Sequence, residues 1–274
     1  MGTLLALAFI ILLEVEVERF IHLDYHIELD NMKLNMRMQR IVAIVLLLSI
    51  FSTKGSHELQ VEERPSNRLN PAIYDDIIMW EDNRNGNWDI CGCYLSTGEE
   101  FQITTNRENQ LLPAIYGNIV VWMDNKNGSL DIYGFDLSIE EEFPLTKNPN
   151  EQRSPAIYED IVVWQDDRDG NWDIYGYNLS ESREFPITTS ESDQKYPAIY
   201  DNIVVWQDSR NGNVDIYGYS LSTGEEFPIT TNRNPQHSPA IYENIIVWQD
   251  NRNGNWDIYG YDLSTSTEFQ VLML

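Results

Sequence analysis

The chain has 274 residues, a formal net charge of −26 and two cysteines. A surface this acidic repels phosphate backbones, so nucleic acid is excluded as a partner, and a protein or a cell-surface glycan is expected instead. The length suits one large domain or two small ones.

Residues 1–56 are predicted to form a leader. Residues 41–51 are an apolar run of 11, preceded by Lys33, Arg37 and Arg40 and followed by small residues. A basic stretch, a short apolar stretch and small residues are typical of a secretory signal, and the run is shorter than the ~20 residues that span a bilayer. A signal peptide at about residues 32–56 has normal length, so residues 1–31 are interpreted as an over-extended gene start. We expect an exported protein, extracellular or at the cell surface, that contacts a membrane only through an uncleaved leader.

Residues 57–274 consist of five copies of a 42-residue repeat. No insertion or deletion disturbs the spacing of its Pro-Ala-Ile-Tyr motif, which begins at Pro71, Pro113, Pro155, Pro197 and Pro239. A fixed period of about 40–45 residues is typical of the four-stranded blade of a β-propeller. We expect one blade to start near each of these prolines.

The fifth copy shows the four strands predicted in each repeat. They are a short extended segment at residues 239–242, an apolar run at 245–250, and strands at 256–263 and 268–271. Asn-Gly between the second and third strands is a strong hairpin signal, and the short connections predict an antiparallel meander. The second strand is apolar on both faces, so each sheet must be covered on both sides. We predict an all-β fold, a β-propeller of five four-stranded antiparallel blades; a β-sandwich does not explain five equal units.

Closure of the ring involves both ends of the repeat region. Residues 58–61 (ELQV) align with residues 226–229 (EFPI), so a fourth strand precedes the first blade, and the chain also ends on a fourth strand. We expect the N-terminal strand at the edge of the last blade, either outside the C-terminal strand or in its place. A truncated copy of a larger ring is the alternative.

Residues 247–259 (VWQDNRNGNWDIY) resemble the Tol-type, WD-like propeller repeat, with its run Ser-Asp-Arg-Asp-Gly-Asn-x-Asp-Ile-Tyr. Residues 166–175 (DDRDGNWDIY) match it most closely, and the resemblance covers residues 58–274. The first turn departs from the family, since Tyr-Asp-Asn or Tyr-Glu-Asn stands where Ser-Pro-Asp-Gly is common. The departure indicates a surface-protein branch. The family makes protein contacts in envelope transport and also occurs as an appendage of peptidases, so the resemblance implies a protein-interaction scaffold.

Two aspartates flank each hairpin, in the pattern Asp-x-(Arg/Lys)-(Asn/Asp)-Gly-(Asn/Ser)-x-Asp. Oxygen-rich loops of this kind can hold Ca²⁺, and the metal candidates are Asp166, Asp173, Asp250 and Asp257. A basic residue already lies between the two acids in every copy: Arg84, Lys126, Arg168, Arg210 and Arg252. Aspartates in turns also accept backbone hydrogen bonds. We therefore expect a structural role for them and no cofactor.

The hairpin face is the candidate ligand surface. Its candidate binding residues are Trp88, Trp172, Trp256, Arg84, Arg168 and Arg252. Exposed indoles would stack on sugar rings. Copies two and four have Leu130 and Val214 in place of the tryptophan, which favours packing between blades instead. The variable loops between blades are expected on the same face.

No catalytic residue is predicted. After residue 56 the histidines are His57 and His237, and there is no Gly-x-Ser-x-Gly motif and no phosphate-binding glycine loop. A glycosidase needs two carboxylates in unequal environments, whereas these aspartates recur in every copy. The sequence therefore favours a non-enzymatic binding scaffold, with a lectin-like carbohydrate binder as the first alternative and a polysaccharide-processing enzyme as the second.

Overall fold

A computed structural model describes residues 66–271 of the chain. These residues form 20 β-strands, and they include no helix able to cross a membrane. The predicted leader, residues 1–56, and the predicted strand at residues 58–61 lie outside the described residues.

Each repeat contributes four consecutive strands that form one sheet, called a blade below. Blade 1 contains β1 (Arg68–Tyr74), β2 (Ile77–Asp82), β3 (Asp89–Tyr94) and β4 (Glu100–Gln102). Blade 2 contains β5 (Gln110–Tyr116), β6 (Ile119–Asp124), β7 (Asp131–Asp136) and β8 (Glu141–Pro144). Blade 3 contains β9 (Gln152–Tyr158), β10 (Ile161–Asp166), β11 (Asp173–Asn178) and β12 (Arg183–Pro186). Blade 4 contains β13 (Gln194–Tyr200), β14 (Ile203–Asp208), β15 (Asp215–Ser220) and β16 (Glu225–Pro228). Blade 5 contains β17 (Gln236–Tyr242), β18 (Ile245–Asp250), β19 (Asp257–Asp262) and β20 (Thr267–Gln270).

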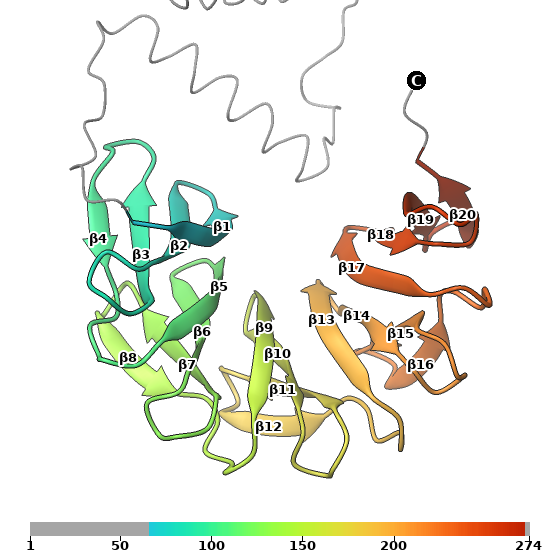
Figure 1. Ribbon diagram of the computed structural model, residues 1–274, viewed down its shortest axis with the longest axis horizontal. Coiled ribbons are helices and arrows are strands. Elements are labelled where there is room, and N and C mark those ends of the chain that lie inside the picture. The colour runs from blue at the N-terminus through green and yellow to red at the C-terminus, as the bar shows by residue number, and fades with distance from the viewer. Residues whose placement is uncertain (1–65, 272–274) are drawn as a thin grey trace, which may run out of the picture. The chain divides into compact units, whose positions relative to one another are not determined.

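Within each blade the strands pair antiparallel and in chain order, as a meander. The first strand of each blade borders the centre of the assembly (Figure 1), and consecutive blades pack side by side along these strands. The predicted all-β fold of five four-stranded antiparallel blades is confirmed.

The first strand of each blade is longer than predicted. In blade 5 it begins at Gln236 instead of residue 239, because Gln236 and His237 pair with Asp250 and Gln249 of the second strand. A bulge between His237 and Ala240 carries the chain past Ser238, which has a φ of 54°. Pairing with the second strand across a bulge therefore extends the first strand beyond its local apolar pattern, and in blade 5 the Gln236 N–H also donates to the Val214 carbonyl of blade 4 (2.8 Å).

The core lies at the four junctions between consecutive blades. At the junction of blades 4 and 5, one cluster contains Val205, Ile216 and Ile229 of blade 4 and Ile241, Ile246 and Trp248 of blade 5. We call the face of a blade that the next blade covers its leaving face, and the face that the preceding blade covers its entering face. Val162, Val163 and Trp164 of the middle blade are all fully buried, so this blade is covered on both sides, as its two apolar faces predict.

Blades 1 and 5 share no packing interface among the described residues, and their ribbons stand apart in Figure 1. Ile258 on the leaving face of blade 5 is consequently 38% exposed, whereas its counterpart Ile216 in blade 4 is fully buried. The fourth position of blade 5 is filled by β20. The expectation that the N-terminal strand replaces the C-terminal one is therefore wrong, and the alternative position outside β20 concerns residues that the structure does not describe.

Candidate functional site

The hairpin between the second and third strands carries a polar cluster that we call the hairpin clamp. In blade 3, Asp166 accepts hydrogen bonds from the Arg168 backbone N–H (2.9 Å) and from Trp164 Nε1–H (3.2 Å). The Arg168 guanidinium donates to Asp166 (2.5 Å) and to Glu184 of β12 (2.5 Å). It also lies 4.0 Å from the centre of the Tyr175 ring. The clamp therefore joins the second, third and fourth strands of one blade.

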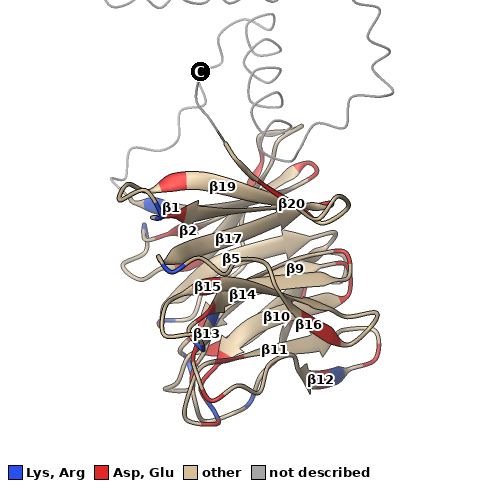
Figure 2. Ribbon diagram, turned by 90° about the vertical axis from the view of Figure 1, so that its right-hand side faces the viewer, with Lys and Arg blue, Asp and Glu red and all other residues tan. Residues whose placement is uncertain are grey.

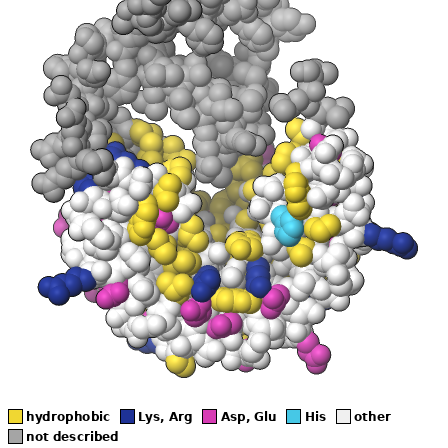
Figure 3. Space-filling model, in the orientation of Figure 1, with side chains coloured by type: hydrophobic (Ala, Val, Ile, Leu, Met, Phe, Trp, Pro, Cys, Tyr) yellow, Lys and Arg dark blue, Asp and Glu magenta, His cyan; other side chains and the backbone are white. Residues whose placement is uncertain are grey.

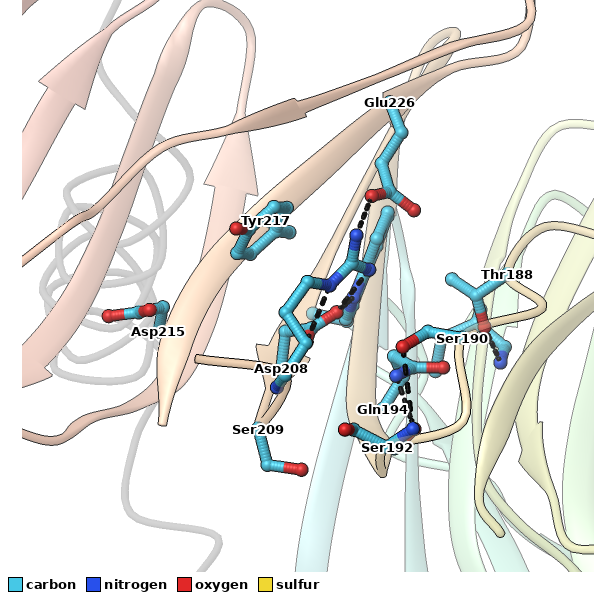
Figure 4. Close-up of polar contacts among 12 residues, drawn as sticks. Thr188, Ser190, Ser192, Gln194, Asp208, Ser209, Asp215, Tyr217 and Glu226 are labelled. Atoms are coloured by element: carbon cyan, nitrogen blue, oxygen red, sulfur yellow. Dashed lines mark hydrogen bonds and ion pairs between the residues drawn. The ribbon is translucent and has the colours of Figure 1, made fainter. Parts of the chain in front are cut away.

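The clamp recurs in other blades. Figure 4 shows the copy in blade 4, where Asp208, Tyr217 and Glu226 surround the Arg210 guanidinium. In the same way, acidic side chains of their own blade engage all three predicted ligand-binding arginines, namely Arg84, Arg168 and Arg252.

The clamp favours the ionised form of its aspartate. Burial tends to raise the pKa of Asp82, but hydrogen bonds from Arg84 and Trp80 outweigh it and hold that pKa at about 2. Burial and the bonds from Arg252 oppose each other in the same way at Asp250, whose pKa is lowered. The clamp is thus an internal ion pair, in which an arginine of the same hairpin neutralises the charge of the aspartate.

The second aspartate of each hairpin has a different environment. Asp173 is buried and accepts hydrogen bonds from Asn171 Nδ2 (3.2 Å) and Thr188 Oγ1 (3.1 Å), both uncharged donors. Burial raises its pKa to about 6 and also raises the pKa of Asp131, its counterpart in blade 2. These carboxylates are desolvated and unpaired with a cation, so ionising them costs free energy.

The calcium candidates lie opposite each other in the hairpin register, Asp166 with Asp173 and Asp250 with Asp257. The first member of each pair is bonded to an arginine. Within residues 66–271, no three His, Cys, Asp or Glu side chains are grouped as metal ligands. A calcium ion at the hairpin would therefore have to compete with the arginine for Asp166 or Asp250.

The three candidate tryptophans do not form one site. Trp172 is half-buried between the cations of Arg153 and Lys195, which lie 5.5 and 5.9 Å from its ring. Trp88 is half-buried in the same position of blade 1. Trp256 is 51% exposed and pairs with the His237 ring at 5.1 Å. Trp88 and Trp172 pack at blade junctions, whereas Trp256 is exposed in blade 5, which no further blade covers among the described residues.

Sequence reasoning missed several side chains at the start of the first strands. Arg153, Lys195 and His237 occupy equivalent positions two residues before the repeat proline, and Tyr196, beside Lys195, is 53% exposed. Figure 3 shows basic side chains and the histidine among hydrophobic side chains near the centre of this face. The available signal was the variation at this position between otherwise similar copies, which is typical of binding surfaces on a constant scaffold.

A row of five tyrosines follows the other end of the first strands. Neighbouring ring centroids lie 4.7–4.9 Å apart along Tyr74, Tyr116, Tyr158, Tyr200 and Tyr242. Burial raises the pKa of Tyr116 and of Tyr200. The row therefore links the first strands of all five blades through ring contacts.

The leaving face of blade 5 is the exposed apolar sheet surface of the described residues. Ile258, Phe269 and Val271 are exposed there, beside the exposed Gln249. Elsewhere on the molecule acidic residues are spread over the blades and basic residues are fewer (Figure 2). The apolar face of blade 5 contrasts with this charged surface.

Comparisons with known proteins identify the fold. No sequence family and no curated protein matches the chain. The structure is similar to TolB from Acinetobacter baumannii, with 18% identity and a TM-score of 0.59 over 74% of this chain and 53% of that one. It is also similar to a nidogen/laminin complex (13% identity, TM-score 0.54, 75% of this chain and 79% of that one). A puromycin-hydrolyzing peptidase from Mycobacterium tuberculosis matches with 12% identity and a TM-score of 0.60, over 77% of this chain and 38% of that one. The chain thus spans about half of the TolB and less than half of the peptidase, and the likeness shows that it has the fold of a TolB-like β-propeller.

Proposed function

We propose that this protein is an exported, cell-surface β-propeller that binds other proteins and has no catalytic activity, in a surface-protein branch of the Tol-type repeat. The leaving face of blade 5 carries the proposal. Ile258 is 38% exposed there, although the same residue is fully buried in the four other blades. Exposed apolar surfaces of this kind are typical of protein interfaces.

Two further observations support the proposal. One of the similar structures is a nidogen/laminin complex, which joins two proteins. The predicted signal at residues 32–56 supports export, and the acidic surface suits a soluble protein outside the cell.

The binding surface is tested with two matched variants of the full chain, Ile258→Glu and Ile139→Glu. Both replace an exposed isoleucine, but Ile139 lies in the turn after β7, away from the leaving face of blade 5. In pull-downs from a cell-envelope extract, we expect the wild type and Ile139→Glu to retain the same protein and Ile258→Glu to lose it. If all three proteins retain the partner equally, the leaving face of blade 5 is not the binding surface. If the wild type retains no protein, the proposed binding function is wrong.

Export is tested by expressing the full gene with a C-terminal tag and sequencing the N-terminus of the exported protein. We expect the mature chain to begin between residues 52 and 57, after the apolar run. Accumulation of the uncleaved chain inside the cell would contradict the proposed location.

A lectin-like carbohydrate binder is the second candidate, because half of the Trp256 surface is exposed. Trp256→Ala should then abolish binding on a glycan array, whereas Trp172→Ala, at a half-buried indole, should not. Turnover of a polysaccharide or peptide by the purified protein would instead favour an enzyme, the remaining alternative.

A further inference from the structure

The two ends of the strands carry different charges. The turns from the first to the second strand and from the third to the fourth strand of each blade lie at one end, which we call the turn face, and the hairpins lie at the other. The segments of the turn face are residues 75–76, 95–99, 117–118, 137–140, 159–160, 179–182, 201–202, 221–224, 243–244 and 263–266. They contain nine acidic residues and no lysine or arginine: Asp75, Asp76, Glu99, Glu140, Glu159, Asp160, Glu181, Asp201 and Glu243.

The basic residues of the loops lie at the hairpin end. One is in each hairpin, and others are in the loops between blades: Arg84, Lys126, Arg168, Arg210, Arg252, Arg107, Lys147 and Arg233. Arg183, the first residue of β12, directly follows a segment of the turn face and pairs with Glu181 (2.9 Å). The segments of the turn face therefore carry negative charge alone, whereas the hairpin end mixes both signs.

The row of five tyrosines lies beside these negative charges. Each is the last residue of a first strand and directly precedes a segment of the turn face: Tyr74, Tyr116, Tyr158, Tyr200 and Tyr242. All five are half-buried, and the first strands that carry them border the centre of the assembly (Figure 1). Part of the aromatic surface of the row thus stays accessible to solvent at the turn face.

An acidic residue follows the tyrosine in four of the five blades, namely Asp75, Glu159, Asp201 and Glu243. Their φ values are 48–52°, in the left-handed region that favours glycine, and blade 2 has Gly117 at this position. The sequence thus keeps a carboxylate where the backbone alone favours glycine. Within residues 66–271, no lysine or arginine forms an ion pair with these four carboxylates.

These carboxylates act on the tyrosine rings. Burial raises the pKa of Tyr116 and of Tyr200, and negative charge raises it further, that of Glu159 at Tyr116 and those of Asp201 and Glu243 at Tyr200. The tyrosine row and the carboxylates therefore form one surface. Such a surface favours a cation, because an aromatic face attracts a cation within about 6 Å of the ring centre and the carboxylates add Coulomb attraction.

We propose that the turn face binds a lysine- or arginine-rich segment of a partner protein, whose basic side chains contact the tyrosine row and the carboxylates beside it. The carboxylates favour an extended chain over a single ion, because each stands in a different blade and no three are grouped as metal ligands within the described residues. The turn face is separate from the leaving face of blade 5, where Ile258 lies near the hairpin end of β19. Either binding surface can thus be wrong without the other.

The test measures binding of a fluorescent oligolysine peptide to the purified full chain by fluorescence anisotropy at low ionic strength. Two double variants remove the same charge from exposed positions. Glu159→Gln with Asp201→Asn acts at the turn face, and Glu108→Gln with Glu191→Gln acts in the loops at the hairpin end. We expect the first pair to weaken binding about tenfold and the control pair by less than about twofold, because the attraction between charges is screened with distance.

The aromatic contribution is tested at Tyr158, the middle of the row. Tyr158→Leu should weaken binding several-fold, whereas Tyr158→Phe keeps the ring face and should bind as the wild type does. Equal weakening by both double variants would mean that the peptide responds to net charge alone, and either that result or no binding overturns the proposal. Displacement of the peptide by CaCl₂ at an ionic strength at which NaCl does not displace it would also overturn it, since the carboxylates would then hold a metal ion.

Discussion

The two aspartates of each hairpin are the same residue type and pair across the sheet, yet their surroundings have opposite effects on the ionised carboxylate. Asp166 is bonded to Arg168 and Trp164, whereas Asp173 faces only Asn171 and Thr188. A buried carboxylate stabilises a fold when a cation and donors meet it, and it costs free energy when its partners are neutral.

The first prediction compares Asp166→Asn with Asp173→Asn at pH 7. Asp173→Asn should stabilise the protein by about 1–2 kcal/mol, because it removes a desolvated charge and keeps the hydrogen-bonding shape. Asp166→Asn should destabilise it by about 3 kcal/mol, because it removes the buried carboxylate of the ion pair and leaves Glu184 as the charged partner of the Arg168 guanidinium. Denaturant unfolding measures both, and stabilisation by Asp166→Asn would contradict the described clamp.

The second prediction concerns pH. Burial raises the pKa of Asp173 in the folded protein to about 6 from the ordinary aspartate value of 3.8, so the folded state binds this proton more tightly than the unfolded state. The penalty for ionising Asp173 is complete above pH 6 and disappears below pH 4. The melting-temperature advantage of Asp173→Asn should therefore be largest above pH 6 and vanish near pH 4. If the advantage in melting temperature did not change with pH, packing and not the charge of Asp173 would be its cause.

At the scale of the strand, a side-chain acceptor on one blade holds the bulge of the next. The Tyr196 N–H, at a residue with a φ of 55°, donates to Gln165 Oε1 (2.9 Å), and the Ser238 N–H donates to Gln207 Oε1 (2.7 Å). The bond satisfies a backbone group that the bulge removes from strand pairing. Gln249 is the equivalent residue of blade 5, and it is exposed.

The third prediction uses Gln249 as the matched control for Gln165. Gln165→Ala should destabilise the protein by about 1–3 kcal/mol, since it leaves the Tyr196 N–H without its acceptor. Gln249→Ala should change stability by less than about 0.5 kcal/mol. Chemical denaturation of the two variants makes the comparison. Equal losses would mean that Gln249 bonds to Asn70 of blade 1 and that the ring closes in solution.

At the scale of the molecule, charge and clamps act together. The net charge of −26 produces repulsion across the surface. The clamps neutralise part of it locally with cations from their own blades, such as Arg168 and Arg210. The repulsion that remains is long-range and is screened by salt.

The fourth prediction follows from this difference between local ion pairs and long-range repulsion. Raising NaCl from about 10 to 150 mM should raise the melting temperature, because the Debye length falls from about 30 to 8 Å. EDTA should leave the melting temperature unchanged, and CaCl₂ at equal ionic strength should act as NaCl does. A drop of many degrees on chelation would establish a calcium site that displaces Arg168 or Arg252.

The sequence alone determined the number of blades, their four strands and the two-sided burial of the second strand. These features depend on local pattern: the 42-residue period, the Asn-Gly hairpin and runs such as residues 245–250. The extension of the first strands to Gln236 and its equivalents was not predictable in this way. It depends on pairing with the second strand on the far side of a bulge, as between Gln236 and Asp250, which no local pattern near Gln236 reveals.

Only the tertiary structure decided which candidate residues are free. The repeat presents Trp172 and Trp256 alike, and the arginines look equally available. The structure places Trp172 between two cations, leaves half of Trp256 exposed and pairs Arg168 with a glutamate 16 residues away. The lack of a packing interface between blades 1 and 5 in residues 66–271 was equally hidden, because curvature comes from the packing of side chains at each junction and is not encoded in the length of the repeat.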